Sequence, residues 1–293
     1  MKVRSWLQVP GNDAERLAAA MGTGADAVVV DIGCVGQDEL GQALAMTNEW
    51  LTAHRTNVLE SRAMSRWVRI HALDSGARWR DDLLAVIPAA PDGIVLPRAA
   101  GPDMVRQLAA EMYEIEQRNG IEANSIRIVP ILGETPAAAL AIPQFVEAGH
   151  QRLFAFAWQP GDLAGEIGAG RKVDARGGWT CAFAQVRAQM LLAAHASGLV
   201  AIDALRPGCE DSKILARFAR EGRADGFAGM LLDDPGQVPV VNAAFSAGSA
   251  ATGHAVRKPV LDLVPEEADE EMDEAPPVIG GRRVFGGATL RPA

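Results

Sequence analysis

The chain has 293 residues, 48% of them hydrophobic and 22% charged, which is typical of a soluble globular protein with a sizeable core. Its formal net charge is −9, but eight acidic residues lie within residues 262–274, so the rest is nearly neutral and nucleic-acid binding is not expected. Neither a signal peptide nor a membrane-spanning run is expected, and three scattered cysteines indicate neither disulfides nor a zinc site, so a reducing cytoplasm is the predicted location.

Short β-branched runs alternate with longer amphipathic stretches. The runs predicted as strands are Val3–Val9, Ala27–Ile32, Trp67–Ile70, Gly93–Leu96, Arg127–Leu132, Leu153–Ala157, Leu199–Ile202 and Gly226–Leu232. The stretches predicted as helices include Asp13–Met21, Asp38–His54, Pro102–Asn119, Pro136–Ala148, Thr180–Ser197 and Asp211–Glu221. Strands that alternate with helices pair in parallel, and eight such units in roughly 240 residues predict a (β/α)₈ TIM barrel.

A doubly wound open sheet is the alternative architecture. It is disfavoured because Pro10-Gly11-Asn12, rather than a GxGxxG turn, follows the first predicted strand. The strand and helix pattern stops after residue 247. Residues 1–247 are therefore predicted to form one barrel domain, and residues 248–293 an irregular extension with an acidic linker and a Gly/Arg-rich tail.

The active site of such a barrel lies at the carboxyl ends of its strands. Polar residues expected there are Asp31, Arg69, His71, Arg98, Glu134, Asp162, Asp203, Asp233 and Asp234. Of the five histidines, only His71 falls near this site, whereas the others show no ligand spacing. Arg4, Arg98 or exposed helix amino ends could hold a phosphate, although no P-loop is present.

Glu134 and Asp162 follow neighbouring predicted strands, so their carboxylates are expected to meet. Two carboxylates at one point repel each other unless a cation or a proton joins them. A hard cation such as Mg²⁺ takes one or two carboxylates and completes its octahedron with water and substrate oxygens. Alternatively, both residues simply complement the amino ends of the helices that follow them.

Arg69 interrupts an apolar strand, and a buried arginine must be paired. Its planar fork suits the carboxylate or carbonyl oxygens of a substrate. An internal salt bridge to Asp31 is the alternative.

Several segments, in this order, resemble the citrate lyase β-subunit/HpcH-HpaI aldolase superfamily. They are RSWLQVPGN, GADAVVVDI, WVRIHALDS, PDGIVLPRA, IVPILGET, GDLAGEIGA, GLVAID and GFAGMLLDDPGQVPVVNAAFS, which lie within residues 3–246, with a weak echo in GGRRV. The resemblance implies a Mg²⁺-dependent carbon–carbon lyase that acts on acyl thioesters of the malyl, citramalyl or citryl type, carried by coenzyme A or an acyl carrier protein. The departures from the family pattern given below extend the expected substrates to a free 2-oxo acid. It also implies a homo-oligomer, a trimer or larger.

By position, the resemblance makes Arg69 the catalytic arginine that binds the substrate carbonyl and carboxylate, and Glu134 and Asp162 the Mg²⁺ ligands. Asp31, His71 and Arg98, from their places at the strand ends, are expected to complete the substrate site. The family pattern is altered at Gly33, Cys34, Gly161, Met230 and Asp234, and also at Phe285, where the correspondence with the family pattern is weaker. Two hypotheses follow: a lyase or aldolase with an altered substrate, or a catalytically silent relative that binds a metabolite or a partner protein.

Overall fold

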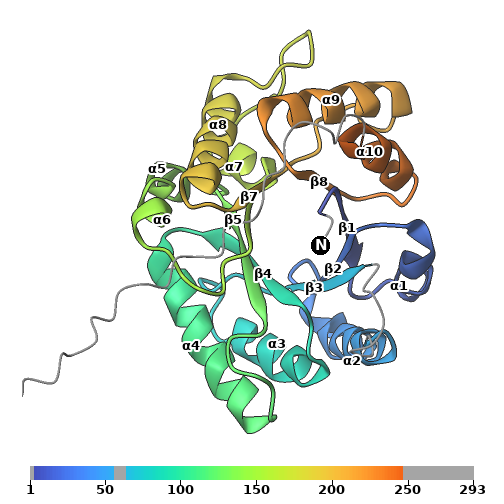
Figure 1. Cartoon of the computed structure of the whole chain (residues 1–293), viewed down its shortest axis with the longest axis vertical. Helices are drawn as coiled ribbons and strands as arrows, with labels where there is room; N and C mark the ends of the chain where they lie inside the picture. The colour runs from blue at the N-terminus through green and yellow to red at the C-terminus, as the bar shows by residue number, and fades with distance from the viewer. Residues whose placement is uncertain (1–2, 56–63, 247–293) are drawn as a thin grey trace, which may run out of the picture. The chain divides into compact units, whose positions relative to one another are not determined.

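Eight parallel strands close into a barrel in sequence order in the computed structural model, which describes residues 3–55 and 64–246 (Figure 1). The strands are β1 (Ser5–Pro10), β2 (Ala27–Asp31), β3 (Ser65–Arg69), β4 (Gly93–Ala99), β5 (Arg127–Leu132), β6 (Ala155–Trp158), β7 (Val200–Asp203) and β8 (Gly229–Leu232). β1 pairs with both β2 and β8, so the sheet is closed. The predicted TIM barrel is confirmed, and the open doubly wound sheet is excluded. The predicted extension, residues 248–293, lies outside the described residues.

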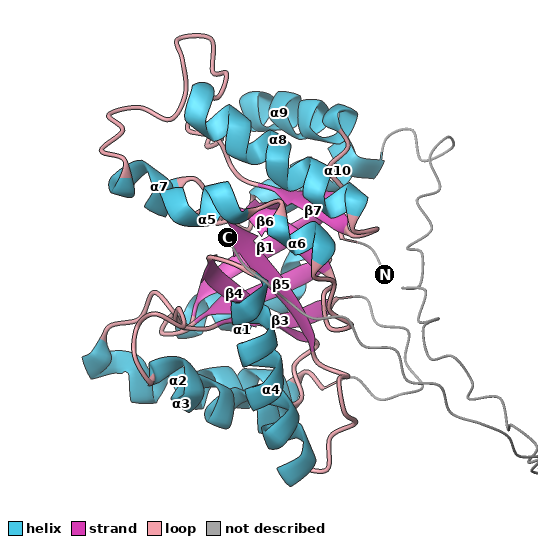
Figure 2. Cartoon of the chain, turned by 90° about the vertical axis from the view of Figure 1, so that its left-hand side faces the viewer, coloured by secondary structure: helices cyan, strands magenta, loops and turns pink. Residues whose placement is uncertain are grey.

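Helices surround the strands on the outside of the barrel (Figures 1 and 2). They are α1 (Ala14–Ala20), α2 (Gln37–Ala53), α3 (Arg78–Val86), α4 (Pro102–Arg118), α5 (Pro136–Ala141), α6 (Gln144–Glu147), α7 (Gly161–Glu166), α8 (Cys181–Ala196), α9 (Ser212–Asp225) and α10 (Gln237–Ser246). In the described part of the chain, no helix is both long enough and apolar enough to cross a membrane. A long loop joins α7 to α8, and Figure 2 shows it extending beyond the helices.

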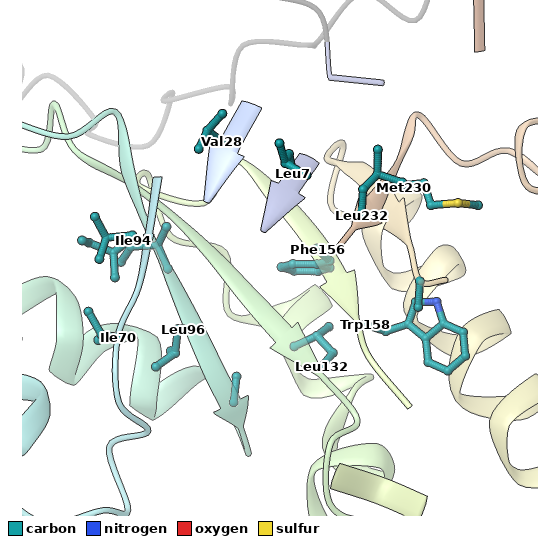
Figure 3. Close-up of a cluster of buried hydrophobic side chains, with 14 of the residues drawn as sticks. Leu7, Val28, Ile70, Ile94, Leu96, Leu132, Phe156, Trp158, Met230 and Leu232 are labelled. Atoms are coloured by element: carbon teal, nitrogen blue, oxygen red, sulfur yellow. The ribbon is translucent and has the colours of Figure 1, made fainter. Parts of the chain in front are cut away.

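Side chains of the strands alternate between two apolar layers. Leu7 and Val28 point into the outer layer between strands and helices, which Figure 3 shows, whereas their neighbours Trp6 and Val29 fill the barrel interior. Because both faces are buried, the strands read as continuous apolar runs rather than as alternating ones.

The interior is closed at the amino end of the barrel by large aromatic rings. Trp6 and Trp67 have ring centroids 4.9 Å apart, and Phe154 lies 5.4 Å from Trp67. Gly93 of β4 makes room for this cluster, since a Cβ atom there would lie 2.1 Å from the Trp67 ring. With this end filled by aromatic rings, the polar cavity described below lies at the opposite end.

Arg4 belongs to this amino end, which corrects its expected role in phosphate binding. It precedes β1, and its guanidinium donates to both carboxylate oxygens of Asp26, at 2.7 and 2.8 Å. Arg4 therefore lies on the side of the barrel opposite the strand carboxyl ends, and its charge is already matched.

Candidate active site

The carboxyl ends of the strands surround a cavity of about 290 Å³, here called the central cavity. Its lining residues are Gln8, Arg69, Glu134, Gln159, Pro160, Gly161, Asp162, Lys172, Ala204, Leu205, Leu231 and Asp233. An adjoining cavity of about 220 Å³ shares Arg69 and adds Asp31. Four of the six predicted site residues, namely Asp31, Arg69, Glu134 and Asp162, are thus brought together at this end of the barrel.

Arg69 ends β3 directly beside Asp31, which ends β2, because the two residues are paired in the strand register. One terminal nitrogen of Arg69 lies 3.0 Å from Asp31 Oδ2, and the other lies 3.5 Å from Glu134 Oε1. The Nε atom of Arg69 is buried and makes no hydrogen bond within the described residues. The structure therefore contains the Asp31 salt bridge, and it also places the same guanidinium on the cavity wall.

Glu134 is 1% exposed and follows β5 through Gly133. Burial raises the pKa of Glu134 to about 7, although Arg69 and the backbone N–H of Arg98 act in the opposite direction. That N–H donates to Glu134 Oε2. A cation placed beside Glu134 would reverse the effect of burial, because it stabilises the charged form.

Arg98 does not line the central cavity but contacts both predicted metal ligands, Glu134 and Asp162. It lies where the register between β4 and β5 shifts, and its φ angle of +51° turns its backbone N–H toward Glu134. Its guanidinium contacts Asp162 at 3.4 Å, Glu166 at 2.9 Å and Asp74 at 3.2 Å. The guanidinium of Arg98, which was expected to bind a substrate, is therefore paired with three carboxylates of the protein.

Asp162 lies in the first turn of α7, and its side chain is 46% exposed. This place agrees with the helix-complementing alternative considered for it. The same carboxylate also lines the central cavity together with Glu134, so the two interpretations are compatible.

His71 is not on the cavity wall. It is 6% exposed, and its Nδ1 and backbone nitrogen both lie 2.8 Å from Asp82 Oδ2 of α3. Asp203, at the end of β7, is likewise turned away from the barrel interior, where it accepts hydrogen bonds from Trp158 and Arg187. The placement of Asp203 follows from the alternation of side chains along β7, since its neighbour Ile202 faces the barrel interior. His71 lies two residues beyond the end of β3, and its ring is held there by Asp82.

The cavity contains polar residues that sequence reasoning did not select. Gln8 lies within the apolar β1 strand and accepts a hydrogen bond from Gln159 at 3.3 Å, so its polarity in such a strand was an available signal. Lys172 comes from the loop between α7 and α8, where no strand or helix periodicity in the sequence predicts that its side chain faces the cavity. Asp233 was noted only for its place after the last strand, and it lines both the central cavity and the adjoining one.

The donor chemistry of the site suits a hard cation. Among residues 3–55 and 64–246, no three or more His, Cys, Asp or Glu side chains are grouped so as to hold a metal ion. A metal would therefore depend on the two carboxylates Glu134 and Asp162, with water and substrate oxygens as further ligands. This is the usual arrangement for Mg²⁺.

Known proteins share both the sequence pattern and the barrel. The HpcH/HpaI aldolase/citrate lyase family model matches residues 4–235. A (3S)-malyl-CoA thioesterase of Cereibacter sphaeroides is 28% identical over 249 residues, which cover 84% of this chain and 78% of that protein.

Two solved structures from Mycobacterium tuberculosis have the same fold. Protein CitE in complex with magnesium and acetoacetate gives a TM-score of 0.69 at 25% identity, covering 86% of this chain and 93% of that one. A citrate lyase beta subunit complexed with oxaloacetate and magnesium gives a TM-score of 0.66 at 26% identity, covering 83% and 97% of the two chains. With the family model matching most of its length, this chain belongs, as a divergent member, to the HpcH/HpaI aldolase/citrate lyase family.

Proposed function

We propose that this protein is a Mg²⁺-dependent carbon–carbon lyase of the aldolase type, acting on a 2-oxo acid or on a hydroxyacyl thioester of the malyl or citryl type. The observation that carries the proposal is the position of Arg69, 3.0 Å from Asp31 and 3.5 Å from Glu134, on a cavity that Asp162 also lines. The relatives support it, because magnesium and oxaloacetate or acetoacetate are bound in the two solved structures.

Glu134 and Asp162 would hold the metal. When bound, Mg²⁺ supplies Lewis-acid polarisation of the substrate oxygens. Arg98 would keep both carboxylates in place, since its backbone N–H binds one and its guanidinium binds the other.

Arg69 would donate hydrogen bonds to the oxygen on which negative charge develops as the carbon–carbon bond breaks. In that cleavage the bond electrons pass to the thioester side as an enolate. The hydroxyl proton must leave so that the new carbonyl can form. Asp233 is a suitable acceptor for that proton, since its carboxylate lines the central cavity and has no ion-pair partner among the described residues.

A larger cavity of about 590 Å³ adjoins the central one and shares Leu205 and Asp233 with it. Arg16 and Arg206 lie on its wall. This space would accommodate the part of a thioester beyond the acyl group, whether coenzyme A or the arm of an acyl carrier protein.

A catalytically silent binding protein is the second candidate, and the altered motifs favour it. Burial raises the pKa of Cys34 to about 11, so this thiol cannot stand in for a lost carboxylate. At Gly33 a side chain would clash, because a Cβ atom there would lie 2.6 Å from the Ile70 carbonyl oxygen. Met230, at the altered position of β8, is buried in the outer layer and does not face the cavity.

Incubation with malyl-CoA and Mg²⁺ separates the candidates by their products. Glyoxylate with acetyl-CoA would indicate the lyase, and malate with free coenzyme A would indicate a thioesterase. The absence of turnover of malyl-, citryl- and citramalyl-CoA, with oxo-acid binding retained, would favour the silent protein. Removal of Mg²⁺ with EDTA and the Arg69→Met variant are the controls, and each should abolish lyase turnover.

Three further features stay predictions from the sequence and the family resemblance. They are the division into a barrel of residues 1–247 and an extension of residues 248–293, self-association into a trimer or larger, and a cytoplasmic location.

A further inference from the structure

Lys172 is a cation on the central cavity that the proposed reaction does not use. The described residues include two lysines, Lys172 and Lys213, and of these Lys172 lines the cavity. Its side chain makes no hydrogen bond or ion pair with any residue in the described ranges. An ammonium group without a partner on the wall of a cavity is free to pair with an anionic ligand.

The backbone of Lys172 is held in place by a small hairpin. Its carbonyl oxygen accepts hydrogen bonds from Thr180, from the backbone nitrogen at 3.0 Å and from the hydroxyl at 3.3 Å. Val173 and Trp179 form an antiparallel bridge, and the Trp179 ring packs edge-on against Trp158 of β6 at 4.9 Å. The loop between α7 and α8 is thus attached to the barrel at the point where Lys172 faces the cavity.

The other charges on the cavity are already matched or assigned. Glu134 and Asp162 would neutralise a bound Mg²⁺ ion, and Arg69 is paired with Asp31. Asp233 is assigned above as the acceptor of the hydroxyl proton, and the Arg16 guanidinium donates to its backbone carbonyl oxygen at 3.3 Å. Lys172 remains as the cation available for a second anionic group on a substrate.

We propose that Lys172 determines substrate specificity by binding the second carboxylate of a dicarboxylic 2-oxo acid. The first carboxylate and the oxo group would face the metal ligands and Arg69. A monocarboxylic oxo acid such as pyruvate leaves Lys172 without a partner, whereas oxaloacetate, which differs by one carboxylate, supplies one. This inference rests on the proposed function, since it takes Glu134, Asp162 and Arg69 as the binding site of the oxo acid.

Calorimetric titration with Mg²⁺ and either freshly dissolved oxaloacetate or pyruvate tests the role of Lys172. We expect the full-length protein to bind oxaloacetate about 10- to 100-fold more tightly than pyruvate, the range for one charged hydrogen bond. Lys172→Met should remove this preference and leave pyruvate binding unchanged. Lys213→Met, at the exposed start of α9 and outside all three cavities, is the matched control and should keep the preference.

If the unaltered protein binds both acids and Lys172→Met leaves their affinity ratio unchanged, the assignment of Lys172 is overturned while the proposed function stands. If the unaltered protein binds neither acid with Mg²⁺, the proposed function fails, and this inference fails with it. Borohydride treatment in the presence of pyruvate adds a further check. A stable adduct on Lys172, from reduction of an imine formed with loss of water, would show a covalent role and contradict the ionic one.

Discussion

Arg69 touches two carboxylates and also lines the cavity, so its replacement by lysine should affect both stability and binding. Lysine keeps the charge but loses the planar fork that reaches Asp31 and Glu134 at once. We expect the affinity for an oxo acid to fall by about 1.5–3 kcal/mol, the range for charged hydrogen bonds. The melting temperature should fall by a few degrees, because about 1 kcal/mol corresponds to ~2–4 °C in a domain of this size.

Both quantities are measured on the same variant, with Arg80→Lys as the control. Arg80 is 45% exposed and pairs with Glu111 at 3.1 Å, and such surface pairs contribute little. A lower melting temperature with unchanged oxo-acid affinity in Arg69→Lys would show a purely structural arginine and would remove the main support for the proposed enzyme.

Glu134 should make the stability of the metal-free protein depend on pH. Its folded-state pKa of about 7 lies above the ordinary glutamate value of 4.5, so the folded state favours the protonated carboxyl. The stabilisation is therefore complete below pH ~4.5 and is lost as the pH rises through about 7. From pH 5 to 8 the free energy of unfolding should fall by up to about 3 kcal/mol, since each pKa unit corresponds to about 1.4 kcal/mol.

Denaturant unfolding at several pH values in EDTA measures this dependence, with Glu134→Gln as the matched variant. The amide cannot ionise, so this variant should lack the part of the slope that Glu134 causes. Saturating Mg²⁺ should also flatten the slope of the unaltered protein, because a bound cation favours the carboxylate. Equal slopes for the two proteins in EDTA would show that Glu134 does not titrate in this range.

The site residues differ in how far their sequence positions could predict them. Asp31, Arg69, Glu134 and Asp162 end or follow strands, so the barrel itself brings them together. The roles of Arg98 and His71 depend on a register shift and on the carboxylate of Asp82, neither of which leaves a periodic signal. Lys172 was missed because the fold of its hairpin, rather than any strand, decides which way it faces.

At the level of elements, all eight strands were predicted, since runs buried on both faces are continuously apolar. Helix α3 is not among the stretches named from the sequence. Its buried Trp79, Leu83 and Val86 lie at helical spacing, but charged residues separate them. The predicted helix 136–148 is two helices, α5 and α6, with Pro143 between them. Proline lacks the N–H group that a continuous helix would need at this point.

The amino end of the barrel gives a prediction at the same scale. Gly93→Ala would place a methyl group 2.1–2.7 Å from three atoms of the Trp67 ring, which is itself buried against Trp6. We expect a loss of about 1–3 kcal/mol, as for other overpacked cores. Thermal unfolding is the measurement. Gly41→Ala in α2 is the control, since nothing lies within 4 Å of the new methyl group and alanine favours the helix interior. Equal melting temperatures for the two variants would show that the Trp67 ring moves aside without a loss of stability, and would contradict the prediction.

At the scale of the whole molecule, the barrel and the acidic segment differ in what can stabilise them. β1 pairs with β8, and α10 follows β8, so the (β/α)₈ pattern is complete by Ser246. Residues 262–274, which lie outside the described residues, hold eight carboxylates and no basic residue, and from this composition we expect them to add little burial of apolar surface. The stability of the barrel should therefore not depend on this segment.

A chain that ends at Leu261 tests this expectation. Its melting temperature should lie within about 2 °C of that of the full chain, which corresponds to less than about 1 kcal/mol in a domain of this size. Oxo-acid affinity should also be unchanged, because the described residues that line the three cavities all belong to the barrel. The two proteins are compared by thermal unfolding at several protein concentrations, since a contact between copies makes the melting temperature depend on concentration.

A large fall in melting temperature on truncation at every concentration would show that the removed segment packs on its own barrel. A fall that grows as the protein is diluted would instead place the segment in a contact with a second copy, and the predicted self-association would then depend on it.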